Sequence, residues 1–405
     1  MARRPGNRVH HAGVGPSLLL PPVPMFDPTL TPEQDQLIET ARRFAAENLI
    51  PHATEWDSRE EFPTAVFKKA WELGLMNVEL PETYGGVGLH TFDGCLVSEE
   101  LAFGCAAVAT SIMCNHLGAL PLLIAGSEGQ KEEWLGRLGR EFSFVSYACS
   151  EPDAGSDVAG MKSKIVRDGD GWRLTGQKRW ITNAGHASFF TGFATMDPTK
   201  KHKGITAFVV AADQPGVSTG RKEDKLGQRA SDTRDVIFED VRLTNDQILG
   251  QPGDGFSIAM ETFDRSRPMI AALAAGIIRR CAEESKSYAL ERKAFGAPIA
   301  QHQGVQFMIA EMVMAYEAVR LLWQKAAWEV DNGVKRTSTS AIAKAWGADL
   351  AMKSAVDAVQ VFGGYGYTKE YPVEKLMRDA KLLQIYEGTS QIQRVVISRN
   401  FLFRS

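Results

Sequence analysis

Several features that would define a class of protein are rare or missing in this sequence. Its 405 residues contain five cysteines, which are odd in number, widely spaced and free of any C-x-x-C pattern (Cys95, Cys105, Cys114, Cys149 and Cys281). We therefore expect free thiols in a reducing compartment, and neither a disulfide framework nor a cysteine-based zinc site. The eight histidines include no H-E-x-x-H, and no acidic or Cys/His cluster has metal-ligand spacing, so we predict no metal site.

Charge and long apolar runs exclude further functions. The net charge of −3 and the lack of a broad basic stripe argue against binding of nucleic acid through its phosphates. Small ligands that carry phosphate remain open, because a few well-placed arginines are enough to bind them. We find no apolar run that approaches the roughly 18 residues needed to span a bilayer, so the sequence predicts a soluble protein with no stable membrane insertion.

Residues 1–26 have an unusual composition. They contain Arg3, Arg4 and Arg8, no acidic residue, and a cluster of proline and leucine at residues 16–22. A mitochondrial transit peptide is one interpretation, and a disordered extension upstream of a true start at Met25 is the other. The prolines interrupt any amphipathic helix, which favours a disordered N-terminal extension over residues 1–27 and a cytoplasmic, bacterial protein. A transit peptide would instead indicate the mitochondrial matrix.

The hydrophobic period divides the rest of the chain into three parts. Apolar residues recur at helical spacing over residues 28–141, alternate as in strands over residues 142–255, and return to helical spacing over residues 256–405. We predict an α+β fold with an N-terminal α-helical domain, a middle β-barrel or sandwich domain and a C-terminal four-helix bundle. The apolar content of the last part is generous for one bundle and indicates burial between subunits.

Two short motifs carry little weight. The segment Gly216–Gly220 matches the G-x-S-x-G of hydrolases, but a nucleophile elbow needs a following helix and a downstream histidine base. A charged segment follows instead, and His302 is the only histidine downstream, so we favour a turn between strands. The glycine-rich segment at residues 81–88 lacks the G-x-G-x-x-G order of a dinucleotide site.

One carboxylate stands at a predicted break between two helices. The pattern predicts a helix that ends near Tyr386, a break at Glu387 and Gly388, and a new helix from Thr389 or Ser390 with an S-x-x-Q capping pattern. Apolar neighbours would desolvate the charged form of Glu387 and raise its pKa toward the range of a general base. The alternative is a solvated loop acid next to a helix N-terminus.

Two segments of the β region suit a flat polar ligand. Residues 147–157 end a strand in a turn that is dense in backbone donors and hydroxyls, and residues 177–185 contain an indole and a hydroxyl. Strand alternation places Trp180 and Thr182 on one face. Such a face fits a heteroaromatic ring such as a flavin. An amphipathic strand packed on a neighbouring helix would give the same pattern.

Five segments follow one another along the chain: Tyr147-Ala148-Cys149-Ser150-Glu151-Pro152-Asp153-Ala154-Gly155-Ser156-Asp157, Trp180-Ile181-Thr182-Asn183, Glu291-Arg292-Lys293-Ala294-Phe295-Gly296, Gln360-Val361-Phe362-Gly363-Gly364 and Tyr386-Glu387-Gly388-Thr389-Ser390. In order and spacing they resemble the acyl-CoA dehydrogenase family, and its medium-chain members most closely. The resemblance runs from about residue 28 to the C-terminus.

The resemblance implies an FAD enzyme that oxidises an acyl-CoA to the trans-2-enoyl-CoA. Glu387 matches the base that removes the α-proton while flavin N5 takes the β-hydride, and the backbone N–H of the base binds the thioester oxygen together with a ribityl hydroxyl. Some relatives carry the base at the position of Ser266, which cannot serve here. The family also implies a homotetramer that passes electrons to an electron-transfer flavoprotein. The alternatives are an acyl-CoA oxidase that uses O₂ and a non-catalytic protein that binds acyl-CoA.

The same resemblance implies roles for further residues. Those expected at the flavin ring are Tyr147, Ser150, Trp180 and Thr182. Those expected at the rest of FAD are Arg292, Gln360, Gly363, Gly364, Thr389 and Gln391, with Arg292, Gln360 and the two glycines coming from a partner subunit. Those expected at the acyl-CoA are Ser156, Asp264, Arg267, Tyr386 and Arg399. For Arg267 the alternative is an intrahelical pair with Asp264. Departures from the family pattern at Ala109, Met113, Asp153 and Ala294 leave the preferred acyl chain length open and remove one hydrogen bond to the FAD phosphates.

Overall fold

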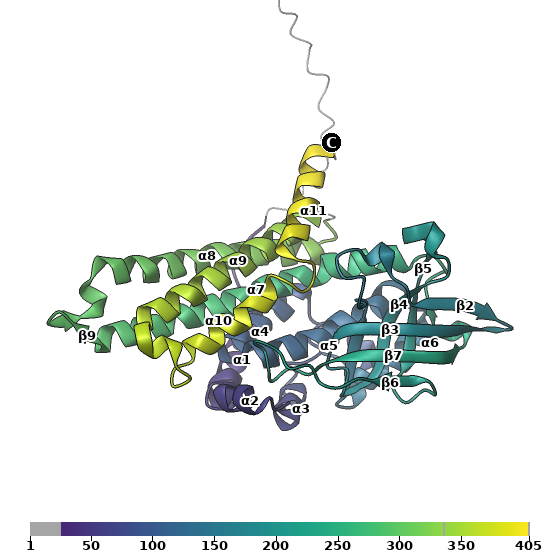
Figure 1. The fold of residues 1–405 in the computed structure, drawn as a ribbon, viewed down its shortest axis with the longest axis horizontal. Coiled ribbons are helices and arrows are strands. Elements are labelled where there is room, and N and C mark those ends of the chain that lie inside the picture. The colour runs from purple at the N-terminus through teal and green to yellow at the C-terminus, as the bar shows by residue number, and fades with distance from the viewer. Residues whose placement is uncertain (1–25, 335–336, 404–405) are drawn as a thin grey trace, which may run out of the picture.

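The computed structural model describes residues 26–334 and 337–403 and has three successive layers of secondary structure. Helices come first, a sheet follows, and long helices complete the chain, which confirms the predicted fold class (Figure 1). The extension predicted at residues 1–27 falls, apart from its last two residues, outside the described part. We propose residues 28–141, 142–255 and 256–405 as the three domains.

In the described chain the first layer contains six helices, whose buried side chains join two cores, one shared with the long C-terminal helices and one shared with the sheet. They are α1 (Pro32–Phe44), α2 (Ala53–Arg59), α3 (Thr64–Glu72), α4 (Thr91–Gly104), α5 (Ala106–Ala125) and α6 (Glu128–Arg140). The first helix begins at Pro32, because the Thr31 hydroxyl caps it by accepting the N–H of Gln34 and Pro32 fits the first turn.

Helix α5 corrects one expectation. It is 20 residues long and apolar enough to cross a bilayer by length and composition, so the prediction that no run approaches that length is wrong. Within the fold, 89% of its most apolar window is buried. Composition does not separate a buried core helix from a membrane span, and here the surrounding helices and the sheet supply the apolar environment.

The middle layer is an eight-stranded sheet with the strand order β6-β7-β3-β2-β4-β5-β8, and β1 pairs in parallel with β4. The strands are β1 (Phe144–Ala148), β2 (Lys164–Asp168), β3 (Gly171–Thr182), β4 (Ala187–Thr195), β5 (Ile205–Ala211), β6 (Val217–Thr219), β7 (Thr233–Leu243) and β8 (Ile248–Leu249). Asp168 pairs with Gly171, so β2 and β3 form a hairpin with a two-residue turn. The G-x-S-x-G segment forms β6 and pairs with β7, so Ser218 lies in a strand and on no nucleophile elbow.

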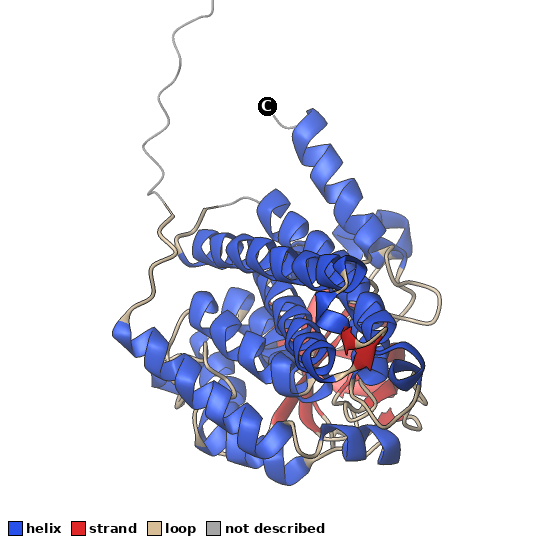
Figure 2. Cartoon of the chain, turned by 90° about the vertical axis from the view of Figure 1, so that its left-hand side faces the viewer, coloured by secondary structure: helices blue, strands red, loops and turns tan. Residues whose placement is uncertain are grey.

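The last layer is a bundle of long helices. They are α7 (Gly255–Glu291), α8 (Gln303–Asp331), α9 (Thr337–Phe362), α10 (Val373–Leu383) and α11 (Ser390–Phe403), with a small hairpin of β9 (Lys293–Ala294) and β10 (Ala297–Pro298) between α7 and α8. Helix α7 contacts α4, α8 and α9 along its length and so forms the centre of the molecule. The C-terminal part of α11 projects away from the other helices, whereas the beginning of α11 contacts α9 (Figures 1 and 2).

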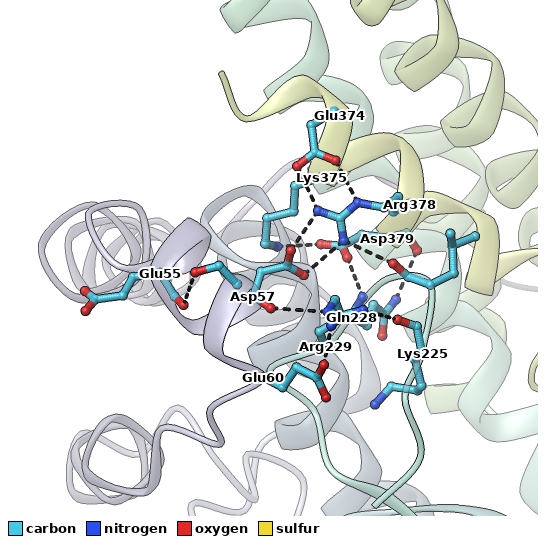
Figure 3. Close-up of polar contacts among 12 residues, drawn as sticks. Glu55, Asp57, Glu60, Lys225, Gln228, Arg229, Glu374, Lys375, Arg378 and Asp379 are labelled. Atoms are coloured by element: carbon cyan, nitrogen blue, oxygen red, sulfur yellow. Dashed lines mark hydrogen bonds and ion pairs between the residues drawn. The ribbon is translucent and has the colours of Figure 1, made fainter. Parts of the chain in front are cut away.

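A buried polar network joins α10 to the other two layers (Figure 3). Asp379 has no exposed surface and accepts hydrogen bonds from the Lys375 ammonium at 2.6 Å and from the Gln228 backbone N–H at 2.5 Å. The preceding residue, Arg378, donates to Asp57 of α2 at 2.7 Å. The chain approaches α10 so closely at Gly227 that a Cβ there would lie 2.3 Å from the Arg378 carbonyl carbon. The helix that leads to the predicted break is thereby fixed against both other layers.

Candidate active site

The break between α10 and α11 is a left-handed turn. Helix α10 ends at Leu383, three residues before the predicted end, and α11 begins at Ser390. Glu387 and Gly388 have φ of +57° and +86°, and a non-glycine residue in this region is strained unless its surroundings hold it there.

The capping predicted for the second helix is wrong in its detail. The Thr389 hydroxyl, and not that of Ser390, accepts an N–H of the first turn, from Ile392 at 3.1 Å. The Ser390 hydroxyl instead donates to Asp349 of α9 at 3.0 Å. The side chain of Gln393 turns back and donates to the carbonyls of Glu387 and Gly388, each at 3.1 Å. The start of α11 therefore stabilises the turn that precedes it.

The Glu387 side chain is buried and incompletely paired. It is 8% exposed, and its Oε2 accepts the hydroxyl of Ser266 from α7 at 2.5 Å. Its Oε1 has no hydrogen-bond partner among the described residues. Burial raises the pKa of Glu387, and the Ser266 hydrogen bond and the cations Arg267 and Lys344 oppose that rise. A buried carboxylate with one free oxygen is equipped to accept a proton.

Three successive backbone donors lie beside this carboxylate. Within the described chain, the N–H groups of Glu387, Gly388 and Thr389 have no hydrogen-bond acceptor. Consecutive N–H groups in a left-handed turn form a concave donor surface for an oxygen that carries negative charge. The turn therefore presents a base and donors for an anionic oxygen within two residues of each other.

Side chains from four elements converge on Glu387. Tyr386 lies 3.3 Å from the Thr110 hydroxyl of α5. The Cys114 thiol of α5 contacts Thr182 of β3 and, through burial first and the Glu387 charge second, has its pKa raised to about 12. Burial also raises the pKa of Tyr147 on β1, whose hydroxyl has no partner within the described chain. The structure thus brings together Glu387, Tyr386, Tyr147 and Thr182, which the sequence singled out separately.

At the end of β3, Trp180 is exposed, Ile181 is buried and Thr182 is half-buried, an order of exposure that fits the alternation expected from the sequence. The alternation passes through an irregularity in the pairing of β3 with β7, and Trp180 has a φ of +65°. Its indole is 56% exposed and carries the Arg179 guanidinium 4.3 Å from the ring centroid. The Arg179 backbone N–H donates to the Ser150 carbonyl at 2.8 Å, which places Ser150 beside this aromatic surface.

Arg267 is buried next to the base. It donates to Asp264 at 2.7 Å, so the intrahelical pair that we set against a ligand-binding role is present. Its Nε has no partner within the described chain, however, and burial lowers its pKa. The pair does not satisfy this guanidinium. Ser156 and Arg399 are exposed, on the turn after β1 and on α11.

The remaining cofactor candidates form two groups. Thr389 and Gln391 lie at the start of α11, close to Glu387. Arg292, Gly363 and Gly364 line an open cavity of about 500 Å³ at the far end of the bundle, and the exposed Gln360 lies one turn before the glycines. Arg292 follows Arg267 by 25 residues along α7, which corresponds to roughly 38 Å. One chain therefore does not bring Arg292 to its own Glu387.

The four residues at which the chain differs from the family pattern lie in different parts of the fold. Ala109 and Met113 of α5 are buried in the helical core. Asp153 pairs with Lys162 at 2.8 Å on the surface. The Ala294 carbonyl lies 3.2 Å from His302 Nε2.

The sequence did not reveal two polar side chains that contact the turn, Ser266 and Lys344. Ser266 was considered only as the position of a base in some relatives, whereas its hydroxyl donates a hydrogen bond to Glu387. Lys344 of α9, which has no exposed surface, donates to the Gly388 carbonyl at 2.6 Å. The sequence signal that could have drawn attention to Lys344 is the presence of a lysine on the apolar face of a predicted helix.

Comparison with known proteins identifies the family. Three family models match successive parts of the chain: acyl-CoA dehydrogenase, N-terminal domain, over residues 31–141, middle domain over residues 146–241, and C-terminal domain over residues 253–402. A protein from Caenorhabditis briggsae described as a probable medium-chain specific acyl-CoA dehydrogenase 2, mitochondrial, is 44% identical over 98% of this chain and 97% of its own length.

Solved structures agree with the family models. Butyryl-CoA dehydrogenase from Megasphaera elsdenii has a TM-score of 0.91 at 37% identity and covers 93% of this chain and 100% of its own. The same values hold for a chain from a study of the electron transferring flavoprotein of Acidaminococcus fermentans. The FAD complex of PigA has a TM-score of 0.89 at 28% identity, covering 94% of this chain and 100% of its own. The chain therefore belongs to the acyl-CoA dehydrogenase family, whose members depend on FAD.

Proposed function

We propose that this protein oxidises a fatty or branched-chain acyl-CoA thioester to its trans-2-enoyl-CoA, with Glu387 as the base that removes the α-proton. The observation that carries the proposal is the turn at residues 387–389. It holds a buried carboxylate with a free oxygen beside backbone N–H groups that have no acceptor within the described chain.

The turn suits the chemistry of a thioester. Protons α to a thioester carbonyl are weakly acidic, so their removal needs a base held close and donors aimed at the oxygen where charge develops. The Glu387 N–H would donate to that oxygen, and the Glu387 carboxylate would accept the α-proton. Tyr386 and Thr110 would form part of the wall that excludes water, which strengthens these electrostatic interactions.

FAD fits the residues present. The exposed indole of Trp180, the Thr182 hydroxyl and the unpartnered Tyr147 hydroxyl would face the flavin ring, beside Ser150. Thr389 and Gln391 would lie near the cofactor at the start of α11. When bound, the flavin supplies the acceptor for the β-hydrogen. The pyrophosphate and the ADP part of a partner subunit's FAD would be bound by Arg292, Gln360, Gly363 and Gly364. The space beside the two glycines is open, because an added Cβ atom at either one would meet nothing within 4 Å.

CoA would be held by Arg267, Asp264, Ser156 and Arg399. The assembly we propose is a homotetramer, because the far end of the bundle can complete a site only in another subunit. Large apolar side chains exposed on α8, α9 and α11 are consistent with such contacts: Phe307, Met314, Trp346, Val356, Phe401 and Phe403.

Electrons would leave to an electron-transfer flavoprotein, and the similarity to a chain from the Acidaminococcus fermentans study supports this partner. The relative from Caenorhabditis briggsae is described as mitochondrial, which keeps the mitochondrial matrix beside the cytoplasm as a proposed location.

A panel of acyl-CoA thioesters of different length and branching tests the function. Anaerobic mixing with the purified yellow protein should bleach the flavin with at least one of them, and the product should be the 2-enoyl-CoA. Rapid return of the yellow colour on aeration, with peroxide, would establish an acyl-CoA oxidase instead. A protein that binds acyl-CoA without bleaching would be a non-catalytic member of the family.

Replacing Ser266 with Ala should move the acid limb of the pH–rate profile. The Ser266 hydroxyl stabilises the charged form of Glu387, so its loss should raise the Glu387 pKa further. A hydrogen bond to a charged group contributes about 1.5–3 kcal/mol, which corresponds to about 1–2 pKa units. Because the base must be ionised, bleaching at pH values below the Glu387 pKa should slow about tenfold for each pKa unit of the shift, while the rate above the new pKa should be kept. Ser285, which is buried on the same helix, provides the control: Ser285→Ala should leave the limb in place. An unmoved limb in Ser266→Ala would contradict the assignment.

A further inference from the structure

Lys344 is a buried ammonium with one acceptor. It lies on α9 with no exposed surface, and within the described chain its Nζ donates only to the Gly388 carbonyl, at 2.6 Å. An ammonium has three donors and is costly to bury without partners. Burial lowers its pKa to about 7, although the nearby Glu387 carboxylate favours the charged form. Nothing in the proposed chemistry requires a lysine at this position, so its burial needs another explanation.

The Gly388 carbonyl is the point where the turn is held. A peptide unit is planar and trans, so a fixed C=O also fixes the N–H on the opposite side of the same unit. The Lys344 bond to the Gly388 carbonyl therefore orients the Thr389 N–H. The Gln393 bond to the Glu387 carbonyl likewise orients the Gly388 N–H. Without these bonds a glutamate at φ +57° would relax toward ordinary helical or extended backbone.

Helix α9 supports both sides of the break. Five residues after Lys344, Asp349 accepts hydrogen bonds from Gln384 at 2.7 Å and from Ser390 at 3.0 Å. Lys344 binds the middle of the turn, and Asp349 binds its two ends. Helix α9 thus positions the turn that carries Glu387 without itself donating or accepting the α-proton in the proposed chemistry.

We propose that Lys344 is a positioning residue for the reaction: its ammonium holds the Gly388 carbonyl and so fixes the turn that presents the Glu387 carboxylate and the N–H groups of residues 387–389 to the thioester. The same cation also faces Glu387 and favours its ionised form. This inference rests on the proposed function for the identity of the base.

Several other groups face this pair, and they set the electrostatic background. They are Cys114 and His116 from α5, Ser266 and Arg267 from α7, Asp349 from α9, Tyr147 from β1 and Tyr386 from the turn itself. None of them contacts the Gly388 carbonyl in the described chain, whereas Lys344 and Gln393 do. Lys344 therefore combines a mechanical and an electrostatic effect that can be separated by substitution.

The test compares Lys344→Met, which removes donor and charge, with Lys344→Gln, which keeps a donor and removes the charge. In Lys344→Met, anaerobic flavin bleaching should slow about 10²-fold at pH 7, in line with the cost of a small misplacement. The effect should fall on kcat more than on KM, and the acid limb should move to higher pH. Amide hydrogen exchange in the peptide that spans residues 384–392 should become faster. Lys344→Gln should keep much of the exchange protection and still show the shifted limb. Lys353→Met, which removes an exposed lysine from the same helix, should change none of these quantities.

The outcomes separate this inference from the function on which it rests. If the unmodified protein bleaches with acyl-CoA and Lys344→Met matches its rate, its pH profile and its exchange, the positioning role is overturned. If the unmodified protein does not bleach, the proposed function fails, while hydrogen exchange in residues 384–392 still decides whether Lys344 holds the turn. A loss of thermal stability with an unchanged pH profile and unchanged exchange would show a merely structural lysine and would also overturn the inference. Should Lys344→Met fail to fold, Lys344→Gln decides by the same measurements.

Discussion

Replacing Glu387 with Gln should abolish bleaching of the flavin by acyl-CoA and leave the protein yellow. The amide has nearly the same shape and can still accept the Ser266 hydroxyl, so the turn should keep its geometry. What it loses is the ability to take a proton. General base catalysis contributes about 10²–10⁴-fold, and we expect a loss of at least about 10³-fold in the rate of bleaching. Exchange of the substrate α-hydrogens in D₂O, followed by mass spectrometry, should be lost together with the bleaching.

Glu99 provides a matched control for this prediction. It is a second buried glutamate whose pKa burial raises, but it accepts hydrogen bonds from Tyr316 at 2.8 Å and Trp323 at 2.9 Å, away from the break. Glu99→Gln should keep the rate of bleaching within a few fold. A raised pKa alone does not make a base, because structural networks produce it as well. Full bleaching by Glu387→Gln would exclude Glu387 as the base.

Local signals in the sequence single out the proposed base, Glu387, but not the residues that contact it. Glu387 stands out because a glycine follows it and apolar residues precede it, and both features act over a few residues. Ser266 and Lys344 contact the break from 121 and 44 residues away, so no short-range pattern connects them to it. The end of α10 was misplaced for the same reason. Residues 384–386 continue the helical pattern, yet Gln384 is drawn to Asp349 and its carbonyl accepts the N–H of Ser390.

A sequence pattern is informative where one physical cause dominates, and it is ambiguous where two structures share the same composition. The alternating exposure of Trp180, Ile181 and Thr182 fits the geometry of a strand, although the pairing of β3 with β7 is irregular just before Ile181. The length of α5 fits both a membrane span and a core helix, and only its neighbours decide between them. Arg292 and the cavity that it lines lie too far from Glu387 to form one site with it in a single chain. Residues proposed to bind one cofactor therefore need not meet within one subunit.

The second large effect is on stability and concerns the network around Asp379. Asp379→Asn would leave the Lys375 ammonium buried without its counter-charge, and that charge is what raises the Lys375 pKa against the effect of burial. Breaking one side of a buried ion pair costs about 3–5 kcal/mol. The midpoint of urea unfolding should fall accordingly. Asp357→Asn on α9 breaks an exposed lysine pair and should cost less than about 1 kcal/mol.

The double variant Lys375→Met/Asp379→Leu distinguishes a buried charge from a lost contact. Removing both charges relieves the unpaired ammonium, so the double variant should be more stable than Asp379→Asn, although the Gln228 N–H then loses its acceptor. The double variant should regain only part of the lost stability, because the Asp379 carboxylate also joins α10 to the middle layer. Below its unfolding midpoint the Asp379→Asn protein should still bleach with acyl-CoA, since Lys344 and Asp349 hold the turn from α9 independently of α10. A single variant as stable as the unmodified protein would show that the network adds nothing to the joining of the layers.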